Sequence, residues 1–333
     1  MKLVIPLAGF GTRMRPHTYS KPKPLINVAG KPVLAHILDG LSSLEIDEAI
    51  FIVGYLGDQI EEFVEKNYHF PATHYVEQKE LKGQAHALWL AREYLKGPIL
   101  IVFVDTIFES DLSVLESPDV DGIAFVKEVE DPRRFGVAIV GEDGYVKRLV
   151  EKPSSMEHRL AVIGVYYIKQ GEALISAIEE LMEKNIQTKG EFYLADALQI
   201  MIDRGARFKP HIVDVWEDCG KPDAVLKTNR YLLEAHYDNS AEANTRSKNS
   251  VVIPPSYVSP KATVEASVIG PYATISDGAC VKSSIVKDSI VDCNACVENI
   301  SLVQSLIGSG ATVKGKFTKL NVGDSSQVEF SGE

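Results

Sequence analysis

Up to about residue 237 the chain alternates short apolar runs with amphipathic stretches. The runs suited to strands are 3–8, 49–56, 99–105, 122–126 and 161–168. Residues 32–44 place apolar side chains at helical spacing behind a proline suited to a first turn, and residues 84–96 show the same spacing. This alternation predicts an α/β domain built on a largely parallel sheet, with ligand-binding loops at the carboxyl ends of its strands.

The pattern changes after residue 237. Residues 238–250, DNSAEANTRSKNS, are small and polar, and we expect a linker there. Beyond them apolar residues recur about every six positions, with register drift between 285 and 307, and small residues precede many of them by two. The apolar positions are Val258, Val264, Val268 or Ile269, Ile275, Val281, Ile285/Val286, Ile290/Val291, Val297, Leu302/Val303, Leu306/Ile307 and Val313. This repeat predicts a left-handed parallel β-helix of hexapeptide repeats over 251–333, following a first domain over 1–237.

Composition narrows the class of protein. The chain has 333 residues, 45% of them hydrophobic, and a formal net charge of -11, which argues against a general nucleic-acid surface. It has no apolar run of the roughly 20 residues that a membrane span needs, and no cleavable signal pattern. The four cysteines do not form a disulfide framework, and Cys293 and Cys296 lack a second ligand pair for zinc. We therefore expect a cytoplasmic protein with no membrane or nucleic-acid partner.

One segment of this acidic protein is basic. Residues 6–25, PLAGFGTRMRPHTYSKPKPL, contain Arg13, Arg15, Lys21 and Lys23 and no acid. The segment is neither a Walker loop nor a dinucleotide fingerprint, because it lacks the Gly-Lys-Ser/Thr ending and has Met14 in place of the third glycine. Glycines after a strand can bring backbone N–H groups close to a phosphate, and the cations would neutralise it. The loop therefore favours a small-anion site over a merely solvated basic loop.

Residues 7–38, LAGFGTRMRPHTYSKPKPLINVAGKPVLAHIL, resemble the opening signature of the sugar-1-phosphate nucleotidyltransferases. The resemblance continues through EQKELKGQAHAL, VDTIF, FGVAIV, VEKP, GVYYI, KGEFYLADAL and WEDCGKP, and through the C-terminal repeat. It is strongest to the long-form glucose-1-phosphate thymidylyltransferases with a C-terminal left-handed β-helix. The resemblance implies a Rossmann-like catalytic domain with a mixed, mostly parallel sheet. It also implies that a nucleoside triphosphate and a sugar 1-phosphate are converted to a nucleotide sugar and pyrophosphate.

The resemblance also assigns roles to individual residues. Arg13 and Lys23 would contact the transferring and leaving phosphates and act as the catalytic residues. Asp105 and Asp218 would hold Mg²⁺. The nucleotide would be bound by Leu7, Gly9, Gly11, Thr12, Gln78 and Gly83, and the sugar phosphate by Gly136, Glu151, Lys152, Gly164 and Glu191. Without the resemblance, each aspartate reads as a helix cap or turn residue, and the Glu151–Lys152 pair as a strand-end ion pair worth at most ~1 kcal/mol.

Substrate choice is less constrained. The spacing of Gln78 and Gly83 is similar to that of family members that read a pyrimidine, which favours dTTP or UTP, and glucose 1-phosphate follows by analogy. The alternatives are a guanylyltransferase acting on GTP and mannose 1-phosphate, and a regulatory homologue without activity. Acetyl transfer by the β-helix would need a general base, usually His, and all eight histidines precede residue 250. We expect the β-helix, the catalytic domain or both to form contacts in a homo-oligomer.

Overall fold

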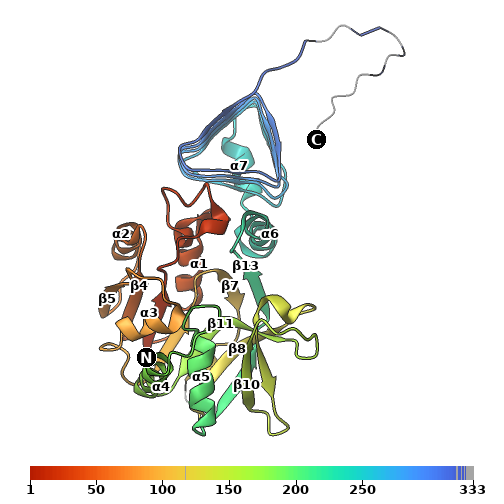
Figure 1. Ribbon diagram of the computed structural model, residues 1–333. Coiled ribbons are helices and arrows are strands. Elements are labelled where there is room, and N and C mark those ends of the chain that lie inside the picture. Colours follow the sequence, from red (N-terminus) through yellow and green to blue (C-terminus); the bar gives the residue numbers. More distant parts are fainter. Residues whose placement is uncertain (117, 320–321, 324, 326, 328–333) are drawn as a thin grey trace. The chain divides into compact units, whose positions relative to one another are not determined.

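The computed structural model describes residues 1–116, 118–319, 322–323, 325 and 327 (Figure 1). The chain divides into an N-terminal unit, Met1–Thr228, and a C-terminal unit, Asn229–Glu333. The division lies inside helix α6 (Pro222–Leu232), earlier than the boundary at residue 237 that the sequence suggested. No helix among the described residues is long and apolar enough to cross a bilayer.

The N-terminal unit is built on one mixed sheet, which confirms the α/β fold class. Its main path runs β10-β9-β11-β6-β1-β4-β5, with β8 and β12 joined beside β11. The strands are β1 (Lys2–Pro6), β4 (Glu48–Val53), β5 (Ala72–Glu77), β6 (Ile99–Val102), β8 (Gly122–Glu128), β9 (Gly136–Val140), β10 (Val146–Glu151), β11 (Leu160–Ile168) and β12 (Phe208–Ile212). The block β6-β1-β4-β5 is parallel, whereas β11 pairs antiparallel with β6, β8 and β9.

Helices and two small ladders complete this unit. They are α1 (Val33–Gly40), α2 (Gly57–Asn67), α3 (Gln84–Leu90), α4 (Gly171–Glu183) and α5 (Leu194–Asp203), with the pairs β2 (Asn27–Val28)–β3 (Lys31–Pro32) and β7 (Thr106–Glu109)–β13 (Val215–Asp218). Apolar residues of α3, α4 and α5 form one buried cluster with strand residues such as Val4, Ile50 and Ile101. The alternate residues Leu3, Ile5 and Phe51 are also fully buried, so both faces of the parallel strands are covered.

The C-terminal unit is a coil of short parallel strands consistent with the expected β-helix. Its three sheets are β14-β17-β20-β23, β15-β18-β21-β24 and β16-β19-β22-β25, and the coil has a triangular outline (Figure 1). The strands are β14 (Val251–Val252), β15 (Tyr257–Val258), β16 (Thr263–Glu265), β17 (Val268–Ile269), β18 (Thr274–Ile275), β19 (Cys280–Lys282), β20 (Ile285–Lys287), β21 (Ile290–Val291), β22 (Cys296–Glu298), β23 (Ser301–Val303), β24 (Leu306–Ile307) and β25 (Thr312–Lys314). Residues 320–321, 324, 326 and 328–333 of the predicted domain lie outside the described part.

The coil geometry explains the register drift in the sequence. Ile269 pairs with Val286, which is 17 residues later, and Val286 pairs with Leu302, which is 16 residues later. A coil of three six-residue sides would need 18, so some sides are shortened to five residues. The corners of these short sides hold residues with positive φ, among them Ala266, Ser283 and Asn299 at 48°, 48° and 56°. The sharper turn therefore uses the left-handed region that L-residues rarely adopt.

Within the expected linker, residues Ser240–Arg246 form helix α7. Ala243 of this helix is fully buried in the core of the β-helix. The side chains of Asn239 and Asn244 each exchange two hydrogen bonds with the backbone, at Val258 and Val252 respectively. These amides supply partners to the first coil, which has no preceding strand. Polar residues that suggested a linker, Asn239 and Asn244, thus cover a strand edge.

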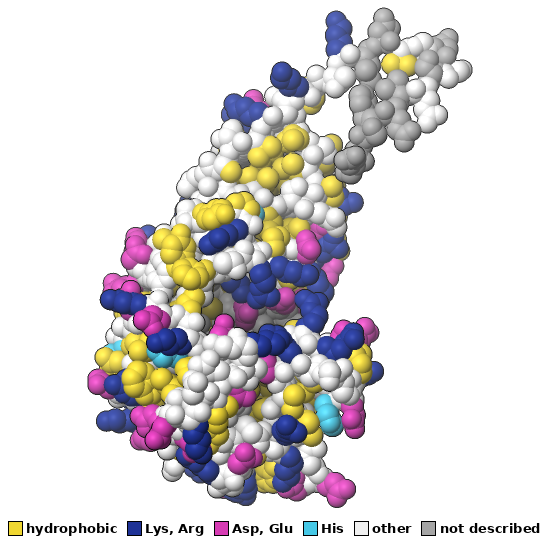
Figure 2. All heavy atoms as spheres, in the orientation of Figure 1, with side chains coloured by type: hydrophobic (Ala, Val, Ile, Leu, Met, Phe, Trp, Pro, Cys, Tyr) yellow, Lys and Arg dark blue, Asp and Glu magenta, His cyan; other side chains and the backbone are white. Residues whose placement is uncertain are grey.

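The three outer faces of the coil differ in character. The outward positions of β16-β19-β22-β25 alternate in charge through Glu265, Lys282, Glu298 and Lys314, and Lys314 Nζ lies 3.0 Å from Glu298 Oε2. By contrast, β14-β17-β20-β23 presents Val251, Ile285 and Val303, whose exposed fractions are 55%, 50% and 61%. Figure 2 shows apolar side chains gathered on the visible face of this unit. One face is therefore solvated by charges, whereas another exposes several apolar side chains next to Lys287 and Ser301.

Candidate active site

A cleft of about 690 Å³ lies at the carboxyl ends of the parallel strands of the N-terminal unit. Its walls come from the segments that follow β1, β5 and β6, together with parts of β9–β11 and β13. All fifteen residues to which the sequence assigned a role line this cleft: Leu7, Gly9, Gly11, Thr12, Arg13, Lys23, Gln78, Gly83, Asp105, Gly136, Glu151, Lys152, Gly164, Glu191 and Asp218. Residues from eight separate stretches of sequence thus meet in one place.

The basic loop is held in shape by Gly11. Its φ of 60° lies in the left-handed region, and a Cβ there would lie 3.0 Å from Lys23 Cβ and 3.1 Å from Thr18 Cγ2. The Gly11 carbonyl accepts hydrogen bonds from Met14 N and from Thr18 Oγ1. These contacts place Arg13 and Lys23 at the cleft. Arg15 and Lys21 do not line it, and the Arg15 guanidinium instead lies 5.0 Å from the Tyr19 ring centroid.

Asp105 and Asp218 are far apart in sequence but become neighbours through the β7–β13 ladder. Asp218 pairs with Thr106 in the antiparallel register, and Cys219 N donates to the Asp105 carbonyl at 2.8 Å. Asp218 Oδ1 accepts a hydrogen bond from Gly220 N at 2.6 Å, and Asp105 Oδ2 lies 3.5 Å from Lys23 Nζ. Burial raises the pKa of the intervening Cys219 thiol to about 12, so it stays protonated at neutral pH.

Asp105 and Asp218 contribute two carboxylates to the lining of the cleft. The described residues contain no cluster of three or more His, Cys, Asp or Glu side chains able to hold a metal. Two carboxylates nevertheless fit Mg²⁺, which commonly takes one or two from the protein and fills its octahedron with water and substrate phosphate oxygens. The site therefore suits a cation that arrives with a phosphorylated ligand.

The opposite end of the cleft is shaped by the β9–β10 ladder. Gly136 pairs with Glu151, and a Cβ on Gly136 would lie 3.0 Å from Glu151 Oε2. Lys152 has a φ of 47°, donates its N–H to the Phe135 carbonyl, and places Nζ 3.4 Å from Glu151 Oε1. The carboxylate and the ammonium are thus both present where a polar ligand could bridge them. The side-chain exposures are 17% for Glu151 and 38% for Lys152, so both remain reachable.

Glu191 and Gly164 enter from two further turns. Glu191 closes a tight turn with Thr188, through paired backbone hydrogen bonds of 3.0 and 3.1 Å, and Thr188 Oγ1 donates to Asp196 Oδ2. Burial raises the pKa of Asp196. Gly164 has a φ of 83°, and its carbonyl accepts a hydrogen bond from Phe103 N. Both turns depend on backbone conformations that glycine permits, at Gly164 and at Gly190, whose φ is 82°.

Gln78 and Gly83 lie at the end of the cleft beyond β5. The Gln78 side chain is buried, and its Nε2 donates to the Gly83 carbonyl at 3.2 Å. Gly83 packs against the backbone of Phe192, because a Cβ there would lie 2.4 Å from the Phe192 carbonyl oxygen. Phe192 in turn donates to Lys82 O and accepts from Ala85 N. The segment carrying Gln78 is therefore tied to the segment carrying Glu191.

The structure also adds residues that sequence reasoning did not place in the site. Tyr193 and Trp216 line the cleft, and Trp216 meets Phe135 edge-on at 4.9 Å between ring centroids. Both aromatic residues sit inside stretches that carried the family resemblance, KGEFYLADAL and WEDCGKP. The two neighbouring arginines have different surroundings. Arg134 lines the cleft, whereas Arg133 donates two hydrogen bonds of 2.8 Å to the Asp131 carboxylate.

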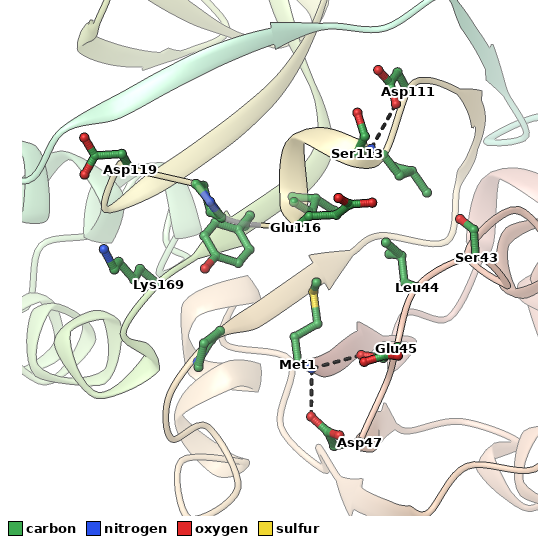
Figure 3. Close-up of a pocket in the computed structure, with 15 residues that line it drawn as sticks. Met1, Ser43, Leu44, Glu45, Asp47, Asp111, Ser113, Glu116, Asp119 and Lys169 are labelled. Carbon is green, nitrogen blue, oxygen red and sulfur yellow. Dashed lines mark hydrogen bonds and ion pairs between the residues drawn. The ribbon is translucent and has the colours of Figure 1, made fainter.

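A larger cavity of about 1150 Å³ lies at the opposite, amino ends of β1 and β6 (Figure 3). It is lined by Glu45, Asp47, Asp111, Glu116 and Asp119, against Lys169 and the amino group of Met1. The Met1 amino group is already bonded to the Glu45 carbonyl and the Asp47 carboxylate. Such an acidic lining repels phosphates. The smaller cleft, not this cavity, is the candidate site for an anionic ligand.

Comparisons with known proteins agree with this geometry. Residues 2–235 match the family model described as nucleotidyl transferase. The chain is 31% identical over 328 residues to the bifunctional protein GlmU of Methanocaldococcus jannaschii, covering 92% of this chain and 78% of that protein. It is 29% identical to the low-salt glycan biosynthesis nucleotidyltransferase Agl11 of Haloferax volcanii and 28% identical to a glucose-1-phosphate thymidylyltransferase of Streptomyces griseus, covering 99% of this chain and 100% of each relative.

A solved structure agrees at the level of the fold. It belongs to a Bacillus anthracis protein provisionally named glucose-1-phosphate thymidylyltransferase. The TM-score is 0.59 at 24% identity, and the match covers 69% of this chain and 94% of that one.

Proposed function

Because the chain belongs to the nucleotidyl transferase family, we propose that its cleft transfers a nucleotidyl group from dTTP or UTP to a sugar 1-phosphate, with glucose 1-phosphate as the favoured acceptor. A phosphate oxygen of the sugar attacks the α-phosphorus of the nucleotide, and the bond from that phosphorus to the oxygen bridging the β-phosphate breaks. Pyrophosphate leaves. The nucleophile is already ionised, so the site needs alignment and charge stabilisation rather than a general base.

The observation that carries this proposal is the convergence of charges in the cleft. Four cations line it, Arg13, Lys23, Arg134 and Lys152, together with four carboxylates, Asp105, Glu151, Glu191 and Asp218. Arg13 and Lys23 would neutralise the triphosphate, and Lys152 the sugar phosphate, while Glu151 and Glu191 would accept hydrogen bonds from sugar hydroxyls. This division gives three of the four cations and two of the four carboxylates a partner of suitable chemistry.

The same charge balance supports a requirement for Mg²⁺. Four positive and four negative side chains sum to no net charge, so the lining alone does not compensate two phosphorylated substrates. We propose that Asp105 and Asp218 hold Mg²⁺, which would stabilise charge on the phosphate oxygens when bound. Arg13 and Lys23, which lie beside these carboxylates, would orient the phosphate groups of the reactants.

The test is pyrophosphate release by the purified chain with Mg²⁺, across dTTP, UTP, GTP, ATP and CTP against glucose, mannose, galactose and N-acetylglucosamine 1-phosphates. Release confined to dTTP or UTP with a hexose 1-phosphate supports the proposal. Release with GTP and mannose 1-phosphate would keep the reaction and replace the substrates. No release with any pair would favour a regulatory homologue. An Arg13→Ala variant serves as the control for contaminating activity.

A second activity in the C-terminal unit has weaker support. The M. jannaschii relative is described as bifunctional, and acetyl transfer would be one such second activity. Such a reaction needs a general base, and the described strands of the β-helix contain no histidine. We propose self-association instead, because Val251, Ile285 and Val303 are exposed apolar side chains on one sheet. Cys219, Cys280 and Cys296 carry free thiols, which supports a cytoplasmic location.

A further inference from the structure

Gln78 and His86 form a buried pair beside the nucleotide end of the cleft. Their exposed fractions are 5% and 8%. Gln78 Nε2 lies 3.2 Å from the Gly83 carbonyl oxygen and 3.2 Å from His86 Nδ1. A carbonyl oxygen only accepts hydrogen bonds, so the Gln78 atom facing Gly83 must be the amide nitrogen. The Gly83 carbonyl therefore fixes the orientation of the Gln78 amide. In this orientation Oε1 remains for a ligand in the cleft.

The same contact defines the state of His86. Because the Gln78 amide nitrogen donates, Nδ1 of His86 must carry a lone pair, and the imidazole is neutral with its proton on Nε2. Burial, and after it the nearby Lys82 cation, lowers the pKa of His86, while Glu80 acts in the opposite direction. The ring also stacks on Trp89 in α3, with 6.3 Å between centroids and 21° between planes. The histidine is thus held as a fixed acceptor.

We infer that His86 is a positioning residue for base recognition: with the Gly83 carbonyl, it holds the Gln78 amide so that only its oxygen is offered to the base. This inference rests on the proposed nucleotidyl transfer. An acceptor at this point matches the ring N3–H of uracil or thymine, whereas the corresponding nitrogen of cytosine carries a lone pair. His86 thereby favours UTP and dTTP over CTP without touching the nucleotide.

Turning the amide over shows why two partners are needed. In the reversed orientation Oε1 would face both the Gly83 carbonyl and His86 Nδ1, and two acceptor–acceptor contacts would oppose it. Replacement of His86 by leucine removes one of these contacts. Replacement by asparagine keeps an acceptor oxygen at about the position of Nδ1. The two variants therefore separate a role in orienting Gln78 from a role in packing α3.

The first experiment reads the imidazole directly, by ¹⁵N NMR of the intact chain labelled on histidine. The His86 signals are assigned by their loss in His86→Asn. At pH 7.5 we expect Nδ1 to show the shift of an unprotonated nitrogen and Nε2 that of an N–H. A proton on Nδ1 would overturn the inference, whether or not the chain has transferase activity.

The second experiment measures KM and kcat for UTP, dTTP and CTP. In His86→Leu we expect KM for UTP and dTTP to rise about five- to tenfold, the scale of one buried hydrogen bond, with kcat little changed and the preference over CTP reduced by the same factor. His86→Asn should retain the preference. Equal behaviour of the two variants would refute the positioning role. Absence of turnover in the unmodified chain would instead refute the proposed function, and the NMR result would still decide the state of His86.

Discussion

Lys23 Nζ lies 3.5 Å from Asp105 Oδ2, so a cation suited to phosphate is paired with a carboxylate suited to metal. The Lys23 side chain is 14% exposed, whereas Asp105 is 44% exposed. A phosphate entering the cleft would offer Lys23 a second anion, and Mg²⁺ would offer Asp105 a second cation. The pair is therefore arranged so that each partner keeps a counter-charge as substrates bind.

Lys23→Met should lower kcat/KM for pyrophosphate release by about 10²–10³, the scale of losing one charge-assisted contact in a transition state. Arg15→Ala is the matched control, because Arg15 belongs to the same loop but lies over Tyr19 and does not line the cleft. We expect the control to stay within about threefold of the unmodified chain. A comparable loss in both variants would show that the loop's overall charge matters, not the position of Lys23.

Asp218→Asn should weaken metal binding, because one of the two carboxylates becomes neutral. Mn²⁺ can report this as a spectroscopic substitute, by electron paramagnetic resonance in the presence of nucleotide, alongside the Mg²⁺ dependence of pyrophosphate release. Asp214→Asn is the control, since Asp214 is exposed just before β13 and outside the cleft. Unchanged Mn²⁺ affinity in Asp218→Asn would remove this residue from the proposed metal site.

Gly136→Ala should raise KM for the sugar phosphate about tenfold and leave KM for the nucleotide unchanged. The added Cβ would lie 3.0 Å from Glu151 Oε2, so the carboxylate must move away from the ligand. Gly40→Ala provides a comparison, because an added Cβ there meets nothing within 4 Å. Initial-rate kinetics with each substrate varied in turn distinguish the two constants. A rise in KM for the nucleotide alone would indicate that Glu151 contacts the nucleotide and not the sugar phosphate.

Asp196→Asn should stabilise the fold at neutral pH. Burial raises the pKa of Asp196 above its ordinary 3.8, so the folded state holds its proton more tightly than the unfolded state. That contribution to stability is present below pH 3.8 and is lost as the pH rises through the folded pKa. Asparagine carries no charge and keeps an acceptor for Thr188 Oγ1. Thermal unfolding from pH 3 to 8 should show a difference that grows with pH, and a constant difference would contradict this account.

Ala266→Gly should stabilise the β-helix by about 0.5–1 kcal/mol. Ala266 lies at a corner with a φ of 48°, where the left-handed backbone of an L-residue costs roughly 1–2 kcal/mol. Glycine removes this strain, but part of the gain in stability is lost because glycine has more conformational entropy in the unfolded chain. Ala262→Gly, at a position without positive φ that packs on the same core, should destabilise it by about 1 kcal/mol. Hydrogen exchange in the coil peptides measures both effects, and the same sign for the two variants would disprove the strain argument.

The sequence predicted the fold well where local patterns decide the structure. Inward rows such as Ile269 with Val286, and Ile275 with Val291, follow from apolar spacing, because every coil buries the same position. The sequence could not predict helix α7, because Asn239 and Asn244 satisfy a strand edge that exists only in the folded coil. Charge alone could not separate Lys23 from Arg15, because it does not tell which side of a loop faces the cleft, and only the family resemblance distinguished the two.

The site required longer-range information. Asp105 and Asp218 become neighbours through the antiparallel pairing of β7 with β13, which no local pattern of apolar residues predicts. The family resemblance supplied both positions because it matched whole stretches of sequence. The same stretches contained Tyr193 and Trp216, which the assignment of individual roles passed over. The sequence shows that Gly11 is a glycine, but only its φ value in the structure shows that the turn there requires one.

The repeated coils of the C-terminal unit allow its length to change during evolution by whole coils. Each coil pairs only with the coil before and after it, in register over all three sheets. A duplication or deletion of 16 or 17 residues, the offsets that join Ile269 to Val286 and Val286 to Leu302, would preserve every inward row. The length of this unit can thus change in whole-coil steps without altering the sequence that lines the cleft.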